Sequence, residues 1–275
     1  MGLFDGVLIC TDLDGTLYRN DKSISEENKE AIEFFKREGG SFTFITGRMP
    51  YYSTDAYEAV RPNVPYGCVN GGGVYDGEAG RYIWTMELPR EGLSLARYID
   101  GLFPNVGVQL CCFDRTLFAK ENKVTEIFRQ ITGLPYLAGD YDTKEPLAKI
   151  LFCTHLADEL LAVGKALRGH ALADRFDFIR SEKSLFEILP KGVNKGLALG
   201  KLAEHLGIDM SRTVAIGDYD NDAAMLKAAG CGIAVANASK RALDAADMVT
   251  VSNEEHAIAR VIYDLRDNKI VLHEK

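Results

Sequence analysis

The fold of this chain is constrained most by short apolar runs that alternate with helix-forming segments. Near the N-terminus, segments of helical pattern separate the apolar runs Val7–Cys10, Ser41–Ile45 and Tyr66–Val69. Strand, helix and strand joined by short links predict a parallel sheet with right-handed crossovers. The same alternation returns after Pro190 and continues to the last predicted helix. The sequence therefore predicts an α/β fold built on a Rossmann-like parallel sheet.

The order of the elements changes in the middle of the chain. Between about Met86 and Leu189, neighbouring strand-like runs interrupt the regular alternation of strand and helix. Such a mixed order is typical of an α+β unit with an antiparallel sheet. We therefore predict a core formed by residues 1–85 and 190–275, with residues 86–189 inserted as a second domain.

Polar residues follow four of the predicted strands, at the point where each strand ends. They are Asp12 with Asp14, Thr46, Asn70, and Asp218 with Asn221 and Asp222. The carboxyl ends of parallel strands all point the same way, so these side chains can converge on one crevice. The period of two in an extended strand aims Asp12 and Asp14 toward the same side. Lys195 lies near the start of the helix that precedes the fourth strand and joins the predicted site.

The predicted site holds more acid than base. Four carboxylates close together repel one another unless a cation lies among them, and one lysine neutralises only one of them. A divalent cation completes the charge balance, and oxygen ligands without histidine or cysteine favour Mg²⁺. Acidic groups, a lysine, a threonine hydroxyl and Mg²⁺ together suit the transfer of a phosphoryl group to a carboxylate nucleophile.

The composition limits the partners and the location of the protein. The chain has 32 basic and 40 acidic side chains, and its net charge of −8 argues against nucleic acid or an anionic membrane as the main partner. No apolar window approaches the roughly 20 residues of a membrane span, and the N-terminus does not resemble a signal peptide. The six cysteines form no CxxC pair, which favours reduced thiols. We therefore expect a cytoplasmic protein.

Four motifs in order resemble those of the haloacid dehalogenase (HAD) superfamily. They are DLDGT at Asp12–Thr16, ITGR at Ile45–Arg48, Lys195 within KGVNKG, and GDYDND at Gly217–Asp222. The strand end at Asn70 and the insertion between the second and third motifs are similar to the Cof-like phosphatases, which carry a type IIB cap. The resemblance implies the HAD fold, with the inserted residues as a cap domain and the strand before Asp12 at the centre of the sheet.

The resemblance also implies how the motif residues divide the chemistry. Asp12 would be the nucleophile and form an aspartyl phosphate, while Asp14 would protonate the leaving oxygen and then activate water. Thr46 and Lys195 would bind the phosphoryl group. Mg²⁺ would be held by Asp12, Asp218 and the backbone carbonyl of Asp14.

The other motif residues would support this site. Asp222 would orient the metal ligands or Lys195, and Asn221 would contact phosphate or metal-bound water. Gly15 would let the backbone approach the phosphate closely. Further candidates for contact with phosphate or substrate are Thr16, Gly47, Arg48 and Asn70. For Arg48 and Asn70, local structural hydrogen bonding is an equal alternative.

The function implied by the resemblance is that of a Mg²⁺-dependent phosphatase acting on small phosphorylated metabolites, such as sugar phosphates. The cap would close over the site and select the leaving group. A phosphomutase of the same architecture would use the same residues. Receiver-like signalling modules also combine acids, a lysine and Mg²⁺, but they lack a general acid two residues past the nucleophile. Candidates for specificity, by charge alone, are Arg115, Lys120, Lys123, His155, Arg180 and Lys183.

Overall fold

The computed structural model describes residues 2–272, which fall into two compact units. The first unit, here called the core, comprises the chain up to Gly47, Thr54–Trp84 and the chain from Asn194 onward. The second unit, here called the cap, comprises Arg48–Ser53 and Thr85–Val193. None of the helices within residues 2–272 has the length and apolar character needed to cross a membrane.

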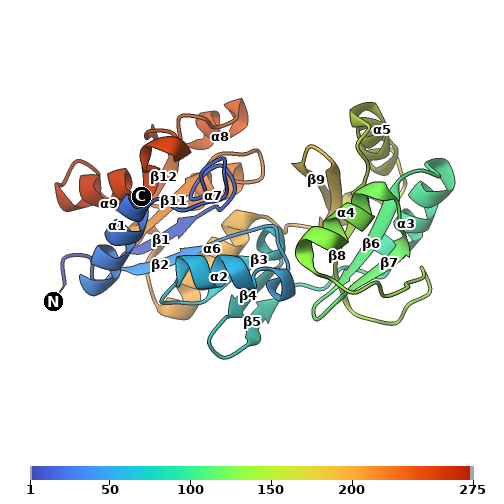
Figure 1. Ribbon diagram of the computed structural model, residues 1–275, viewed down its shortest axis with the longest axis horizontal. Helices are drawn as coiled ribbons and strands as arrows, with labels where there is room; N and C mark the ends of the chain where they lie inside the picture. Colours follow the sequence, from blue (N-terminus) through green and yellow to red (C-terminus); the bar gives the residue numbers. More distant parts are fainter. Residues whose placement is uncertain (1, 273–275) are drawn as a thin grey trace. The chain divides into compact units, whose positions relative to one another are not determined.

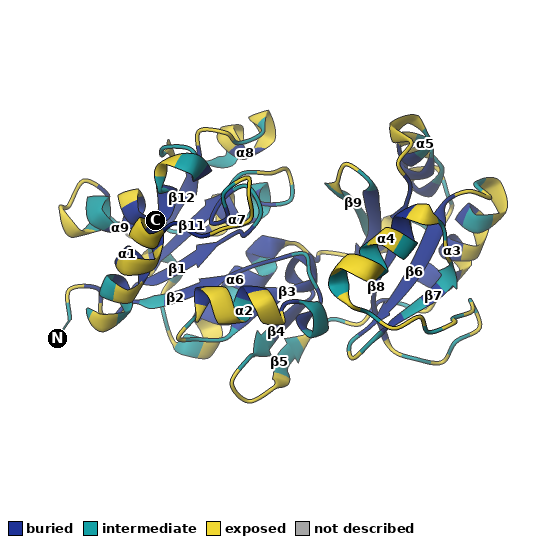
Figure 2. Cartoon of the chain, viewed as in Figure 1, coloured by how far each residue is buried: buried dark blue, intermediate teal, exposed yellow. Residues whose placement is uncertain are grey.

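The core is built on a five-stranded parallel sheet with the strand order β13-β12-β11-β1-β2 (Figure 1). Its strands are β1 (Leu8–Thr11), β2 (Ser41–Phe44), β11 (Thr213–Gly217), β12 (Cys231–Ala234) and β13 (Met248–Val249). Strand β1 is flanked by β11 and β2, and all four of its residues are buried (Figure 2). The predicted Rossmann-like parallel sheet is confirmed.

Helices cover the core sheet. They are α1 (Glu26–Arg37), α2 (Thr54–Val60), α6 (Lys195–Leu206), α7 (Ala223–Ala228), α8 (Lys240–Ala245) and α9 (Ala257–Arg266). Helix α1 begins after Ser25, whose hydroxyl accepts a hydrogen bond from the Asn28 amide. The Asn28 side chain in turn accepts the Ala259 amide at 2.9 Å, which joins α1 to α9. Apolar side chains of α6 and α7 pack together with those of β1 and β11.

The predicted third parallel strand is wrong in its pairing. Strand β3 (Tyr66–Cys68) belongs to a separate antiparallel sheet with β4 (Gly73–Asp76) and β5 (Arg81–Thr85), in the order β3-β4-β5. An isolated parallel bridge between Ile45 and Gly67 connects this small sheet to the end of β2. The reason is the turn Val69–Gly71, which reverses the chain, so that β3 pairs with the strand that follows it.

The cap contains a five-stranded antiparallel sheet with the order β7-β6-β8-β10-β9. Its strands are β6 (Gly107–Cys112), β7 (Thr116–Lys120), β8 (Leu147–Cys153), β9 (Phe176–Glu182) and β10 (Leu185–Pro190), and its helices are α3 (Glu91–Leu102), α4 (Lys123–Thr132) and α5 (Ala157–Arg168). Apolar residues of α3 and α5 pack on one face of this sheet. The predicted α+β unit with an antiparallel sheet is confirmed.

A short segment of the chain groups with the cap although its sequence neighbours lie in the core. Arg48–Ser53, which includes a single 3-10 turn, fell within the predicted core range of residues 1–85. The Tyr51 hydroxyl shares a 2.7 Å hydrogen bond with the Thr116 hydroxyl, and the Tyr52 ring packs edge-on against Phe128. These contacts tie the segment to β7 and α4.

Candidate active site

The centre of the site is a buried lysine between two aspartates. Asp12 follows β1 directly, and its amide donates to the Ile216 carbonyl of β11. Lys195 is the first residue of α6, and its ammonium group is almost completely buried. The Nζ of Lys195 lies 2.5 Å from Oδ1 of Asp12 and 2.5 Å from Oδ1 of Asp222. The structure therefore brings together the residues of the first, third and fourth sequence motifs.

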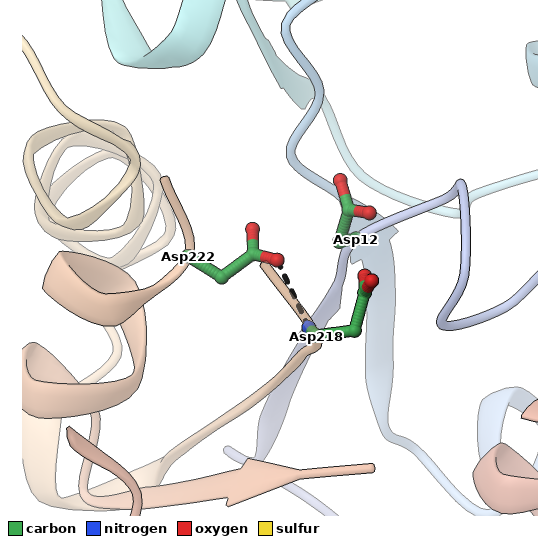
Figure 3. A group of neighbouring side chains, drawn as sticks. All are labelled: Asp12, Asp218 and Asp222. Atoms are coloured by element: carbon green, nitrogen blue, oxygen red, sulfur yellow. Dashed lines mark hydrogen bonds between the residues drawn. The ribbon is translucent and has the colours of Figure 1, made fainter. Parts of the chain in front are cut away.

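Asp218 and Asp222 are fixed by hydrogen bonds on the loop between β11 and α7 (Figure 3). The Thr16 hydroxyl donates to Oδ1 of Asp218 at 2.8 Å. The Oδ2 of Asp222 accepts the amides of Asp218 and Tyr219 at 3.0 and 2.9 Å. Asp222 therefore holds Lys195 with one oxygen and the Asp218 loop with the other. Thr16, a predicted phosphate contact, directs its hydroxyl to Asp218.

The electrostatics of the cluster show an excess of negative charge. Burial raises the pKa of Asp12 well above its ordinary value, and the charges of Asp222 and Asp218 raise it further against the opposing effect of Lys195. Burial and the charge of Asp222 raise the pKa of Asp218 to about 6. Burial alone would lower the pKa of Lys195, but Asp12 and Asp222 outweigh it and hold the pKa above its usual value. One lysine therefore faces three carboxylates.

The same cluster fits a hard divalent cation. One carboxylate oxygen from each of Asp12, Asp218 and Asp222 lies within 4.8 Å of the other two. All the donors are oxygens, which is the ligand set that Mg²⁺ prefers. A β-carbon on Gly15 would lie 2.6 Å from Oδ2 of Asp218, and the φ of Gly15 is +87°. Only glycine therefore lets the backbone after Asp14 pass so close to the Asp218 carboxylate.

Asp14 has surroundings that differ from those of Asp12. Its side chain is 39% exposed, and its Oδ1 lies 2.8 Å from the Nζ of Lys22. Asp14 does not belong to the three-carboxylate group found among residues 2–272. Lys22 was not predicted as a site residue, because nothing in the motif pattern distinguishes a lysine eight residues further along an exposed loop.

A second group of predicted residues meets beside β3. The Asn70 amide donates to the Thr46 carbonyl at 3.0 Å, and Nδ2 of Asn221 donates to Oδ1 of Asn70 at 3.0 Å. A β-carbon on Gly47 would lie 2.9 Å from the Asn70 side-chain amide. The structure thus brings Thr46, Gly47, Asn70 and Asn221 together. Arg48, the remaining residue of the ITGR motif, belongs to the cap.

The backbone is strained in the turn Val69–Gly71, which contains Asn70 of this second group. Val69, Asn70 and Gly71 have φ values of +56°, +52° and +102°, and all three residues are buried. Asparagine and glycine tolerate this left-handed region, but a β-branched valine is an outlier there. Such strain costs on the order of 1–3 kcal/mol at each non-glycine residue and clusters at functional sites. The sequence indicated the turn through its glycines but gave no sign of the strain at Val69.

Most of the cationic specificity candidates make local contacts within the cap. Arg115 pairs with Asp114 and Glu145, Lys120 with Asp100, and Lys123 with Glu126, while Arg180 donates to the carbonyls of Glu182 and Lys183. His155 and Lys183 lie on the surface of the cap. The cap alone therefore does not gather these six side chains into one site.

These motifs and their geometry define a class of protein. The family model for haloacid dehalogenase-like hydrolases matches residues 9–262, and this chain belongs to that family. A relative from Bacillus subtilis (strain 168), the 5-amino-6-(5-phospho-D-ribitylamino)uracil phosphatase YitU, is 30% identical over 264 residues, covering 93% of this chain and 96% of its own. The chain is therefore a HAD-type phosphatase.

Solved structures share the fold over nearly the whole chain. A haloacid dehalogenase-like hydrolase from Bacteroides thetaiotaomicron matches with a TM-score of 0.82 and 26% identity, covering 94% of this chain and 99% of that chain. The subclass IIB sugar phosphatase BT4131 matches with a TM-score of 0.80 and 20% identity over the same shares of the two chains, which shows a common fold. The expected membership of the HAD superfamily is therefore confirmed, and the fold is shared with a structure named a subclass IIB sugar phosphatase.

Proposed function

We propose that this protein is a Mg²⁺-dependent phosphatase that hydrolyses small phosphorylated metabolites, such as sugar phosphates, through an aspartyl phosphate. The observation that carries the proposal is the cluster at the end of β1, where Asp12 is held by Lys195 next to Asp218 and Asp222. A carboxylate fixed in this way beside a cation is a suitable nucleophile for phosphorus, because the cation offsets its repulsion from phosphate oxygens.

The reaction divides between the two aspartates of the DLDGT motif. A carboxylate oxygen of Asp12 attacks phosphorus, and the bond between phosphorus and the ester oxygen breaks. Asp14 gives its proton to that leaving oxygen. Asp14 then takes a proton from water, which attacks the aspartyl phosphate and releases inorganic phosphate. The side chain of Asp14 lies outside the carboxylate cluster of Asp12, Asp218 and Asp222, which supports a role in proton transfer and not in holding the metal.

The remaining residues of the site bind the phosphoryl group and the metal. Lys195 and Thr46 would bind phosphoryl oxygens. Asp12, Asp218 and the backbone carbonyl of Asp14 would hold Mg²⁺, which supplies positive charge to the phosphoryl oxygens when bound. Asp222 has both oxygens engaged by Lys195 and the Asp218 loop, which supports an orienting role and not a place among the ligands.

The class of substrate and the division of labour between the units belong to the same proposal. YitU is named for a phosphorylated ribitylamino compound, and the structural neighbour BT4131 is named a sugar phosphatase. Small phosphate monoesters with a polyol or sugar portion therefore suit this chain. We assign the chemistry to residues 1–85 and 190–275 and selection of the leaving group to residues 86–189, in a cytoplasmic enzyme.

The first test is phosphate release from a generic aryl phosphate, followed by a screen of sugar phosphates and related esters. We expect turnover only with Mg²⁺ and none in Asp12→Asn, which keeps the size of the side chain but removes the nucleophile. Turnover without a divalent metal, or full activity of Asp12→Asn, would refute the proposal. Transfer of the phosphoryl group to a second sugar hydroxyl in place of release would identify a phosphomutase.

The second test separates the two half-reactions with Asp14→Asn. An aryl phenolate leaves with little protonation, whereas the attacking water still needs a base. With an aryl phosphate, this variant should slow hydrolysis of the aspartyl phosphate more than its formation, and the phosphoenzyme should accumulate in rapid-quench experiments. Equal slowing of both steps would contradict the role given to Asp14.

A further inference from the structure

The turn Val69–Gly71 touches three segments that come from distant parts of the sequence. The backbone amide of Asn70 bonds the carbonyl of Thr46, and its side-chain oxygen accepts from Asn221. A β-carbon on Gly71 would lie only 1.9 Å from the carbonyl oxygen of Asn194, the residue before Lys195. One buried turn therefore contacts or adjoins all three segments that carry Thr46, Lys195 and Asn221.

These segments need such a link because of the way the chain passes between the two units. The chain passes from the core to the cap between Gly47 and Arg48 and again between Trp84 and Thr85, and it returns between Ser53 and Thr54 and between Val193 and Asn194. Thr46 and Lys195 thus lie within two residues of a crossing point. A core residue this close to the point where the chain enters the cap would shift with any movement of the cap, unless a contact within the core holds it in place.

We infer that Asn70 is a positioning residue that holds Thr46, Lys195 and Asn221 in one phosphate-binding arrangement through the left-handed turn Val69–Gly71. This inference rests on the proposed function. Asn70 is 1% exposed, and its polar groups are engaged by the neighbouring segments, so it acts through them. The strain at Val69 and Asn70 supports the inference, because strain persists where the surrounding contacts over-determine a conformation.

The experiment compares two substitutions that separate the backbone turn from the side-chain amide. Asn70→Gly keeps the left-handed conformation but removes the bond to Asn221, whereas Asn70→Ala disturbs both. With an aryl phosphate and Mg²⁺, we expect kcat to fall about tenfold in Asn70→Gly and about 10²-fold in Asn70→Ala, since small misplacements cost this much. Inorganic phosphate should bind about tenfold more weakly to Asn70→Ala, while Mg²⁺ affinity stays within about twofold.

Asn63 provides the matched control. It is an asparagine of the same unit, whose side chain accepts the Phe42 amide at 2.8 Å and donates to the Gly40 carbonyl at 3.0 Å, at the end of β2 remote from Thr46. Asn63→Ala should lower the melting temperature but leave kcat and phosphate affinity unchanged. If the two Asn70 variants lose only melting temperature, as this control does, Asn70 has a merely structural role and the inference fails.

A double variant tests whether Asn70 works through Asn221. The variant that combines Asn70→Ala with Asn221→Ala should lose no more activity than the worse single variant, because both remove the same contact. Fully additive losses would contradict the inference. A wild-type protein that binds inorganic phosphate with Mg²⁺ but hydrolyses no ester would refute the proposed function alone, because the phosphate affinities of the variants still measure the effect of the turn.

Discussion

Two buried lysines, one in each unit, show how the same local arrangement serves different purposes. Lys149 of β8 is buried in the cap with its Nζ 2.9 Å from the carboxylate of Glu187 on β10, and both side chains are 2% exposed. Lys195 of the core is equally buried, and contacts Asp12 and Asp222 with Asp218 close by. In both cases burial alone would lower the pKa of the lysine, and the neighbouring carboxylates raise it instead.

The difference lies in the balance of charge. The pair in the cap sets one carboxylate against the ammonium group, so its charges offset one another within the protein. The cluster in the core has two further carboxylates, and the pKa values of both Asp12 and Asp218 are raised by burial and by the charge of Asp222. A buried excess of negative charge costs free energy unless a bound cation offsets it. The imbalance of charge, and not burial, therefore distinguishes the cluster to which we assign Mg²⁺ from the ion pair in the cap.

The largest expected effect is on turnover when Lys195 is replaced. Lys195→Met should lower kcat with an aryl phosphate by about 10³-fold, as the loss of one fixed donor to a developing charge does elsewhere. The variant should also lose stability, because Asp12 and Asp222 remain buried and repel. Lys191→Met is the control, since Lys191 is 61% exposed and pairs with Asp177 on the surface of the cap. If Lys195→Met and Lys191→Met have comparable kcat values, Lys195 has no special role in the reaction, and the contrast between the core cluster and the ion pair in the cap fails.

Replacement of Lys149 should affect stability and not turnover. Lys149→Met leaves Glu187 buried without its cation and should cost about 3 to 5 kcal/mol of unfolding free energy in denaturant titrations. The double variant Lys149→Met with Glu187→Met should recover most of this loss, because a buried pair is often replaced by apolar groups of similar size without penalty. A stable double variant with impaired kcat would show that the pair in the cap also serves the reaction.

Substitutions of Thr16 test whether its hydrogen bond to Asp218 orients that carboxylate for Mg²⁺. Thr16→Val removes the donor to Asp218 and should weaken Mg²⁺ binding by about 10-fold or more, as the loss of an outer partner of a metal ligand does. Thr16→Ser should restore most of the affinity. Thr43→Val serves as the control, because the Thr43 hydroxyl bonds the Pro65 carbonyl away from the cluster. Calorimetric titration with Mg²⁺ measures all three, and equal affinities would contradict the assignment.

The smallest expected effect is the pH dependence of stability that Asp218 of the core cluster contributes. Because the pKa of Asp218 is raised from 3.8 to about 6 in the folded state, the metal-free fold binds a proton that the unfolded chain releases. The contribution of this group therefore favours folding at low pH and declines as pH rises through about 6. Mg²⁺ competes with that proton, so the rise in melting temperature it causes should be larger at about pH 7.5 than at about pH 5. Asp218→Asn should reduce this difference, and the raised pKa of Asp12 accounts for the part that remains.

The sequence was informative wherever one residue type satisfies one local requirement. The run before Asp12 and the hydroxyl of Ser25 predicted β1 and the start of α1 because burial and capping act over a few residues. The convergence of Asp12 and Asp222 followed from the rule that parallel strands end at the same edge, and Lys195 was placed with them because it starts the helix before the fourth strand. These parts of the fold and site needed no knowledge of the distant packing.

Other features depend on contacts that the sequence does not contain. The pairing of β3 with β4 is decided by the turn at Val69, whose left-handed backbone runs against the preference of valine. The hydrogen bond from Thr16 to Asp218 and the ion pair between Lys22 and Asp14 depend on the conformations of loops in the folded protein. In these cases tertiary packing, and not the local conformational preference of the residues, determined the strand pairing and the side-chain contacts.

The position of β1 between β2 and β11 has a consequence for the order in which the chain folds. Leu8 pairs with Ser41 on one side but with Thr213 on the other, so half of the neighbours of β1 are made only after the cap has been synthesised. Apart from the short segment Arg48–Ser53, the cap is one continuous stretch, Thr85–Val193, and it forms its own sheet. Contacts between distant residues form slowly, and domains tend to fold as units. The cap is therefore expected to fold before the core closes around Asp12, so the reactive cluster is assembled last.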